Sequence, residues 1–393
     1  MAELLSPENL CEGISKLLSV NSVFTDKDLK ITVVANKYAG GFTQKKESEK
    51  NKKLLDAALN KIEGKSTVTK SCESELIITE CCGHAVKIAS ETAEKAKSEK
   101  NVLRVIVTAG GDGTSLEVQT GLTKWAQESE ENRKVVFENI VVFRLPLGTG
   151  NDGTDGHVFA ESLDMLEQPL HFANARAIKF SLNGEVTEDG IKEAGKNPAA
   201  YGNAEGKAPW YAFNVAGIGL DAFVCWKTNE EKAKHPGNHY QLMVDFATLN
   251  YNKAFPPEPA VTEFYNGSEL IGKIESAFEM MTFGVSGHRT FGGGKKVFPV
   301  EENAAFVRKL DVLTMVAKNG KFTDGSYVET NLASTFNATK VVLNYDKPVL
   351  CELDGETHLL LKENFPITME LTEPLIQVLE RDDLSWSRGT ERK

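Results

Sequence analysis

The sequence lacks the features that mark several large classes of protein. Its 6 cysteines among 393 residues include no Cys-x-x-Cys pair, so free thiols are expected rather than a disulfide scaffold. No apolar run approaches the ~20 residues that span a bilayer. Residues 1–9 have neither the basic start nor the apolar core of a signal peptide. Because the formal net charge is −11, no binding to nucleic acid is expected.

Two common nucleotide-binding motifs are also missing or misplaced. No Gly-x-x-x-x-Gly-Lys-Ser/Thr segment is present, which excludes a P-loop enzyme. The segment 217–222 has glycine spacing like that of a dinucleotide-binding loop, but it lies in the middle of the chain, outside a first strand–helix–strand unit. What is present is a chain long enough for two domains, with 41% hydrophobic and 26% charged residues, as in globular proteins.

A short apolar strand that ends in a glycine loop is the most informative segment of the chain. The strand at 105–109 is followed by Gly110-Gly111-Asp112-Gly113-Thr114, and the apolar positions from Ser115 onward predict a helix. Phosphate is attracted to the N–H groups and dipole at a helix N-terminus, and a carboxylate such as Asp112 suits Mg²⁺. From these residues alone, a tight turn capped by Asp112 is the alternative.

A second strand, at 140–143, leads into a similar loop. The loop is Pro146-Leu147-Gly148-Thr149-Gly150-Asn151-Asp152. Ligands of open α/β sheets bind at the carboxyl ends of the strands, so the two loops are predicted to share one phosphate-binding crevice. Asn-Asp beside glycine is also ordinary turn chemistry, and this loop alone leaves both interpretations open.

Together the two loops resemble those of the diacylglycerol kinase and sphingosine kinase superfamily of lipid kinases. Five further segments resemble the same family in the same order: residues 31–41, 79–85, 214–222, 291–294 and 354–356. The likeness spans about residues 30 to 378. By this resemblance the chain looks like a divergent, bacterial-type member of the superfamily.

Several positions depart from the family pattern. Lys37 stands where the family usually has proline, and Leu116 where it often has asparagine. Gly153-Thr154-Asp155-Gly156 replaces an apolar-Ala-Arg run. Val307-Arg308 aligns with an Asp-Gly pair that helps to hold a structural metal in bacterial lipid kinases, which puts such a metal in doubt here.

The resemblance implies an α/β N-terminal domain with a parallel sheet, like that of NAD kinase and diacylglycerol kinase. A mainly antiparallel β-sandwich should follow, with the site in the interdomain cleft. We expect a helical extension at 1–30, a nucleotide-binding domain at 31–160, a β-sandwich acceptor domain at 161–372, and a return segment and tail at 373–393.

Hydrophobic periodicity predicts the individual elements. In the first domain we expect strands at 31–36, 74–79, 103–108 and 139–144, helices at 46–62, 83–98 and 115–127, and a connecting helix and crossover at 156–175. In the second we expect strands at 176–182, 210–217, 278–286, 310–316, 338–345, 348–353 and 367–372, a surface loop at 185–208 and helix at 224–254.

The resemblance implies phosphoryl transfer from ATP with Mg²⁺. Asp112 is predicted to hold Mg²⁺, and Glu356 to be the general base. The loop aspartate is the base in related dinucleotide kinases, so the two roles stay interchangeable. The predicted nucleotide-binding residues are Asn36, Thr79, Gly110, Gly111, Gly113, Thr114, Glu117, Gly148, Thr149, Asn151 and Asp152. Without the resemblance, Asp354-Gly355-Glu356 is a plain hairpin turn.

The predicted acceptor is a hydroxyl of diacylglycerol, a sphingoid base or a related lipid. We expect a cytoplasmic enzyme in transient contact with the inner membrane face, and a basic patch at His288, Arg289, Lys295 and Lys296 is a candidate for that contact. Two alternatives stay open: a soluble kinase of the NAD kinase type, which shares the first loop but not the second, and a catalytically weak nucleotide-binding regulator. A homodimer is neither required nor excluded.

Overall fold

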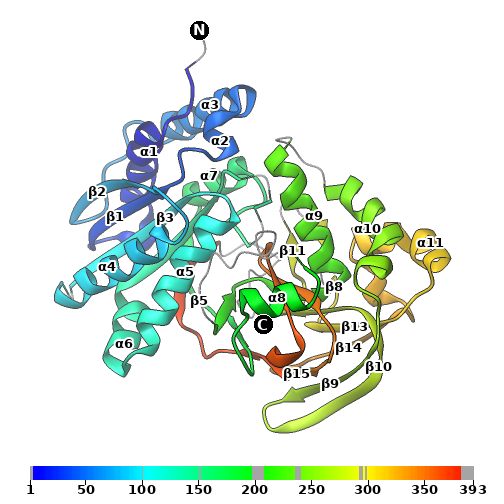
Figure 1. Cartoon of the computed structure of the whole chain (residues 1–393). Coiled ribbons are helices and arrows are strands. Elements are labelled where there is room, and N and C mark those ends of the chain that lie inside the picture. Colours follow the sequence, from blue (N-terminus) through cyan, green and yellow to red (C-terminus); the bar gives the residue numbers. More distant parts are fainter. Residues whose placement is uncertain are drawn as a thin grey trace. The chain divides into compact units, whose positions relative to one another are not determined.

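The computed structural model describes residues 3–99, 101–148, 150–151, 153–196, 208–234, 240–291, 295–296 and 299–381 (Figure 1). The chain divides into two compact units. Unit 1 runs to Ala175 and resumes at Pro374, and unit 2 lies between Arg176 and Glu373.

Over its described residues, unit 1 is built on a six-stranded sheet with the strand order β2-β1-β3-β4-β19-β5. The strands are β1 (Asp28–Ala35), β2 (Ser71–Ile78), β3 (Val102–Gly110), β4 (Ile140–Pro146), β5 (Leu170–Ala175) and β19 (Ile376–Arg381). Neighbouring strands pair in parallel, except for the antiparallel pair of β19 and β5. The unbroken apolar runs of β3 and β4 fit this arrangement, since a parallel sheet is covered on both faces.

Helices cover both faces of this sheet (Figure 1). Helices α1, α3 and α7 share one apolar core with the strands, and α4, α5 and α6 pack against one another and against β3 or β4. The helices are α1 (Pro7–Ser19), α2 (Gly40–Thr43), α3 (Lys45–Lys61), α4 (His84–Ser98), α5 (Asp112–Gln127), α6 (Glu130–Asn139) and α7 (Phe159–Glu167), and a 3-10 turn, η1, spans Ser22–Phe24. Ser6 sets the start of α1, because its hydroxyl accepts the Asn9 N–H at 3.3 Å.

Unit 2 contains an eleven-stranded antiparallel sheet, counted over the part of the chain that the structure describes. Its strands are β6 (Ile178–Ser181), β7 (Trp210–Ala212), β8 (Val215–Gly219), β9 (Pro259–Asn266), β10 (Glu269–Gly284), β13 (Ala304–Arg308), β14 (Ala333–Phe336), β15 (Lys340–Asn344), β16 (Val349–Leu353), β17 (Glu356–Leu360) and β18 (Ile367–Leu371). The long strand β10 pairs with β9 along its first half and with β8 and β13 along its second, which makes the two halves of the sheet continuous. A short ribbon of β11 (Thr290–Phe291) and β12 (Lys295–Lys296) stands apart.

Two apolar cores hold unit 2 together. One lies between the two halves of the sheet and includes Phe264, Phe283 and Phe306. The other lies between the sheet and the helices and includes Phe223, Val244 and Met315. The helices are α8 (Glu188–Glu193), α9 (Leu220–Lys234), α10 (Tyr240–Ala254) and α11 (Val312–Thr323), with 3-10 turns η4 (Ser326–Glu329) and η5 (Lys362–Asn364). Among the residues that the structure places, no helix combines the length and the apolar character that crossing a membrane requires.

The predicted fold class is confirmed: unit 1 is an α/β domain with a mainly parallel sheet, and unit 2 is a curled antiparallel sheet. The four predicted strands and three predicted helices of the first domain are present, and α6 and β5 were not predicted. The first unit extends to Ala175, where β5 pairs with β19 in the first sheet. The chain returns to unit 1 at Pro374.

One strand prediction in unit 2 is wrong. Residues 310–316 lead into helix α11, because the Asp311 side chain accepts the Thr314 N–H at 2.9 Å and caps the helix. Strands β9, β13, β14 and β17 were missed. Part of the expected loop at 185–208 forms α8, and the expected helix at 224–254 is the pair α9 and α10. Residues 197–207 of that loop and 382–393 of the predicted tail lie outside the described residues.

A buried carboxyl group lies beneath α10 in unit 2. Glu279 on β10 is fully buried, and its Oε2 accepts the Leu310 N–H at 3.2 Å. Burial raises the pKa of Glu279 from its ordinary value of 4.5 to about 7, against the opposing effects of the Leu310 N–H, Asn252 and Lys309. The folded protein therefore holds this proton more tightly than the unfolded chain does.

We predict that Glu279→Gln stabilises the protein at alkaline pH. Since the folded-state pKa lies above the unfolded value, the stability contributed by this proton is complete below pH 4.5 and is lost as pH rises through about 7. At pH 8 the free energy of unfolding should rise by up to ~3 kcal/mol in the variant, measured by urea denaturation. Glu269→Gln, at the exposed start of the same strand, is the control. An unchanged stability of Glu279→Gln at pH 8 would contradict the interpretation.

Candidate phosphate-binding site and acceptor turn

The two glycine loops of unit 1 lie against each other. They follow β3 and β4, which are neighbours in the sheet, and the Leu147 N–H donates to the Gly110 carbonyl at 3.1 Å. The Asn151 N–H donates to Asp112 Oδ2 at 2.9 Å, which joins the second loop to the first residue of α5. The two loops therefore lie in contact, as predicted, through Asp112 and Asn151.

Asn151 closes the second loop upon itself. Its Oδ1 accepts the Gly148 N–H at 2.8 Å, and its Nδ2 donates to the Gly148 carbonyl at 3.0 Å. A Cβ atom at Gly148 would overlap the Cα of Gly111, and one at Gly150 would overlap the Asp112 carboxylate. Glycine at 148 therefore lets the two backbones approach this closely, and glycine at 150 leaves room for the Asp112 carboxylate.

A buried ion pair anchors the chain on either side of the second loop. Arg144 and Asp155 are both buried, and Arg144 Nη2 lies 2.9 Å from Asp155 Oδ1. The Arg144 N–H also donates to Asp155 Oδ2 at 2.6 Å, and Gln119 Oε1 accepts from Arg144 Nη1 at 3.1 Å. The Thr154 hydroxyl donates to the Asn151 carbonyl at 3.0 Å. The end of β4 and the segment after the loop are therefore fixed to each other.

Asn36 and Thr79 lie at the ends of the two strands on the other side of β3. The Asn36 N–H donates to the Ala109 carbonyl at 3.0 Å, and Asn36 Oδ1 accepts the Tyr38 N–H at 3.0 Å. The Thr79 N–H donates to the Ala35 carbonyl at 2.9 Å. The loop after β1 reaches the second glycine loop, because the Gly41 N–H donates to the Leu147 carbonyl at 2.8 Å.

Thr114 and Glu117 belong to α5, and the contacts described below are with other residues of unit 1. Thr114 is buried, and a Cβ atom at Gly110 would lie 2.5 Å from its hydroxyl. Glu117 accepts the N–H groups of Gly83 at 2.8 Å and Ala85 at 3.1 Å, and so caps the start of α4. Glu117 therefore has a structural role at the start of α4, and its predicted contact with nucleotide stays a prediction.

The remaining predicted residues divide into those that the structure describes and those that it does not. Gly110, Gly111 and Gly113 lie at the junction of β3 and α5. Thr149 and Asp152 lie outside the described residues. The described parts of the predicted nucleotide site thus share the carboxyl edge of one parallel sheet.

In unit 2 the predicted acceptor turn is a two-residue β-hairpin between β16 and β17. Asp354 and Gly355 have φ values of 49° and 92°, as in a type I′ turn. The Asp354 carboxylate is buried and accepts three backbone N–H groups, from Phe213 at 2.6 Å and from Asn214 and Val215 at 2.9 Å each. Asp354 therefore anchors the hairpin to the start of β8.

Glu356 is the partly exposed carboxylate beside this anchored turn. The Gly355 carbonyl accepts from Asn229 Nδ2 of α9 at 2.9 Å, which fixes the turn from a second side. Burial lowers the pKa of His358 to about 4, so the imidazole two residues further on is neutral at pH 7. Its ring stacks on Trp210 with a centroid distance of 4.2 Å.

Two carboxylates that the sequence did not single out converge near this turn. A Cβ atom at Gly217 would lie 2.7 Å from Asp221 Oδ2 and 2.8 Å from Glu352 Oε1. Glu352 is fully buried, and its Oε2 accepts the Gly355 N–H at 2.9 Å. In the sequence, Glu352 is marked only as an acidic residue near the end of the apolar segment 349–353.

Of the expected basic patch, the structure describes the side chains of His288 and Arg289. Arg289 is buried, and its Nε donates to Asn214 Oδ1 at 2.6 Å. His288 Nε2 lies 2.8 Å from a carboxylate oxygen of Glu301. Burial therefore removes Arg289 from the surface, whereas His288 is exposed, and the basic patch stays a prediction.

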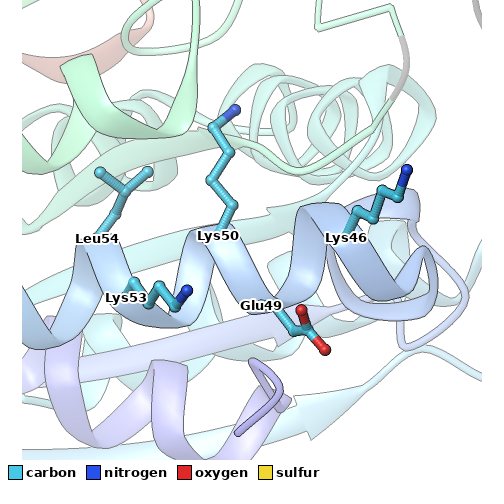
Figure 2. Close-up of a pocket in the computed structure, with 5 residues that line it drawn as sticks. All are labelled: Lys46, Glu49, Lys50, Lys53 and Leu54. Carbon is cyan, nitrogen blue, oxygen red and sulfur yellow. The ribbon is translucent and has the colours of Figure 1, made fainter. Parts of the chain in front are cut away.

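A basic groove lies on α3. Lys46, Lys50 and Lys53 line it with Glu49 and Leu54, and Lys46 and Lys50 extend from the same side of the helix (Figure 2). The exposed pair of Lys50 with Glu47 (2.9 Å) neutralises little of this charge. In the sequence, this groove corresponds to the lysine-rich segment 45–53, for which we had predicted only a helix.

Comparison with solved structures shows the same fold. Two structures of a candidate diacylglycerol kinase from Bacillus anthracis str. Sterne are each 17% identical to this chain, with TM-scores of 0.52 and 0.54. A third structure, of a diacylglycerol kinase from the same organism, is 15% identical with a TM-score of 0.50. Each match covers 89% of this chain and 96% of the other. No curated protein matches the sequence.

The sheet defines unit 1 as an α/β domain with two glycine loops at the carboxyl edge of its parallel strands. Residues 30–171 match the family model described as the diacylglycerol kinase catalytic domain. This segment, which carries both glycine loops, is similar to that catalytic domain.

We predict different effects from replacing the two acids of the turn. Asp354→Ala leaves three buried N–H groups without an acceptor, and should lower the free energy of unfolding by about 3 kcal/mol or more. Glu356→Ala, at a partly exposed position, should cost about 1 kcal/mol or less. Urea denaturation measures both. Equal losses in the two variants would show that Asp354 is not the anchor.

Proposed function

We propose that the protein is an ATP-dependent lipid kinase. It would transfer the γ-phosphate of ATP to a hydroxyl of diacylglycerol, a sphingoid base or a related lipid. The observation that carries this proposal is the contact between the two glycine loops through Asp112 and Asn151, within a segment that matches a diacylglycerol kinase catalytic domain. A reaction of this type depends on positioning and on screening of phosphate charge.

The proposed nucleotide site uses the loop pair and the start of α5. The helix begins at Asp112, so its positive end faces the region where the loops meet. Glycine at 148 lets the second loop lie against Gly111, and glycine at 150 leaves room for the Asp112 carboxylate. Asn36 and Thr79, at the neighbouring strand ends, would line the nucleotide.

Asp112 would hold the magnesium ion, directly or through water. Its carboxylate supplies hard oxygen ligands at a partly buried position, which fits Mg²⁺. No group of three or more acidic, histidine or cysteine side chains that could hold a metal occurs among the residues described. One carboxylate with phosphate oxygens and water is an ordinary magnesium environment. When bound, the ion would neutralise charge on the phosphates.

Glu356 would act as the general base toward the acceptor. The acceptor oxygen attacks the γ-phosphorus, the bond to the bridging oxygen of ADP breaks, and the hydroxyl proton passes to a carboxylate. Asp354 is engaged by three backbone N–H groups, whereas Glu356 is partly exposed on a fixed turn. The exchanged assignment, with Asp112 as base, is separated from this one by the two variants below.

Replacing Asp112 tests the nucleotide side. Asp112→Asn should reduce ATP-dependent lipid phosphorylation by about 10²-fold or more, because it removes the charge that would hold the metal. The assay is transfer of label from [γ-³²P]ATP to total lipid extract and to a nucleotide panel, followed by chromatography. Asp26→Asn, at an exposed position of the same unit, is the control. Turnover that is unchanged in Asp112→Asn would remove Asp112 from the mechanism, and labelled NAD would redirect the assignment to a soluble kinase.

Replacing Glu356 tests the acceptor side. Glu356→Gln should lower turnover by about 10²-fold to 10⁴-fold, because a general base is lost, while ATP affinity stays within about twofold. Equilibrium binding of a fluorescent ATP analogue measures that affinity. The exposed Glu370→Gln in the same unit provides the matched comparison. A loss of nucleotide affinity in Glu356→Gln would place Glu356 on the metal side instead.

A further inference from the structure

The turn after β1 carries an aromatic side chain that folding leaves uncovered. Tyr38 is 73% exposed, more than any other large apolar or aromatic side chain that the structure describes in unit 1. Its neighbour Lys37 is also exposed, and Lys37 Nζ lies 5.2 Å from the centroid of the Tyr38 ring. At this distance an ammonium group is attracted to the face of the ring. An accessible aromatic ring and a cation therefore occupy adjacent positions.

Hydrogen bonds hold this turn in place. The Tyr38 N–H donates to Asn36 Oδ1 at 3.0 Å, and the Ala39 N–H donates to the Asn36 carbonyl at 3.0 Å. Ala39 and Phe42, which follow the turn, are buried in the core of unit 1. Because the backbone is fixed in this way, the Tyr38 side chain is presented to solvent from a defined position.

The turn lies at the edge of the sheet that carries both glycine loops. At its start, the Asn36 N–H donates to the Ala109 carbonyl of β3 at 3.0 Å. Further along, the Gly41 N–H donates to the Leu147 carbonyl of the second glycine loop at 2.8 Å. Since β3 lies between β1 and β4, the segment 36–41 passes over the end of β3, where the first glycine loop begins.

The glycine loops suit the phosphates of a nucleotide better than its base. They and the start of α5 offer N–H groups and the positive end of a helix dipole. Neither loop, 110–114 or 146–152, contains an aromatic residue. Bases stack on aromatic rings, and a neighbouring cation adds to the attraction. Tyr38 supplies such a ring at the same edge of the sheet.

We propose that Tyr38 is a stacking platform for the base of the nucleotide and that Lys37 attracts the phosphates. The base would lie on the Tyr38 ring while the phosphates meet the glycine loops. The inference rests on the proposed function, because it assigns the part of the same nucleotide site that holds the base. Lys37 is one of the departures from the family pattern, so its charge is particular to this chain.

The test is calorimetric titration of the full chain with nucleotides and Mg²⁺, without lipid. Tyr38→Leu should bind ATP about tenfold or more weakly, because leucine keeps an apolar side chain but has no aromatic face. Tyr38→Phe keeps the ring and should bind ATP within about threefold of wild type. Wild type should bind ATP and GTP at least about threefold more tightly than CTP and UTP, since a purine offers the larger surface for stacking, and Tyr38→Leu should reduce this preference.

Replacing Lys37 tests the charge separately. Lys37→Gln should weaken the binding of ATP by about threefold or more and make it less dependent on salt, whereas the affinity for adenosine should stay within about twofold. Lys65→Ala is the matched control and should bind ATP like wild type. Lys65 is an exposed lysine of unit 1 in the segment between α3 and β2, which enters the sheet at its opposite edge. Circular dichroism checks that the variants fold.

Three results would overturn the platform. An ATP affinity that is unchanged in Tyr38→Leu would show that the ring does not contact the base. A loss in Tyr38→Phe equal to that in Tyr38→Leu would show that the hydroxyl, and not the face of the ring, makes the contact. Absence of ATP binding to wild type would remove the nucleotide itself.

Transfer of label from [γ-³²P]ATP to total lipid extract separates this proposal from the proposed function. In an active enzyme, Tyr38→Leu should raise the KM for ATP about tenfold and leave kcat within about threefold, because the base is remote from the reacting atoms. Labelled lipid with an unchanged KM would overturn the platform and leave the kinase assignment in place. Loss of ATP affinity in Tyr38→Leu, in a protein that labels no lipid, would support the platform and contradict the lipid kinase.

Discussion

Hydrogen bonds link the two glycine loops of unit 1, and the one from the Asn151 N–H to Asp112 engages a carboxylate. In this bond's surroundings β3 and β4 are parallel neighbours, glycine at 148 leaves room for the backbone of Gly111, and glycine at 150 leaves room for the Asp112 carboxylate. The bond fixes the orientation of a carboxylate at the first residue of a helix. A phosphate that enters there would meet groups already in place, and such preorganisation is what phosphoryl transfer requires.

In the predicted acceptor turn of unit 2, hydrogen bonds also fix the position of a carboxylate. Asp354 and Glu356 are one residue apart, yet their surroundings assign them different tasks. Three backbone N–H groups bind the Asp354 carboxylate and α9 holds the Gly355 carbonyl, so the hairpin is rigid. A rigid turn that carries a partly exposed carboxylate suits a base that must reach an acceptor hydroxyl.

The sequence predicted unit 1 well because its signals are local. Unbroken apolar runs mark β3 and β4, and glycine loops follow both strands. The strand expected at 310–316 was wrong because Val312, Thr314 and Val316 alternate as in a strand, while the cap at Asp311 favours a helix. Within the candidate site, the sequence did not indicate Glu352. Its carboxylate accepts the Gly355 N–H, a contact that forms only when the β16–β17 hairpin has formed. A contact between a side chain and the backbone of a turn cannot be predicted from the sequence alone.

The departures from the family pattern acquire structural roles in the folded chain. Leu116 is buried in α5, and Val307 is buried in β13. In the segment after the second loop, Thr154 donates to the Asn151 carbonyl and Asp155 pairs with Arg144, which closes the loop by contacts made entirely within unit 1. A weak regulator was considered because these positions differ. Thr154 and Asp155 hold the ends of the second loop together, so divergence at these two positions is compatible with an intact loop, and the weak regulator stays an alternative.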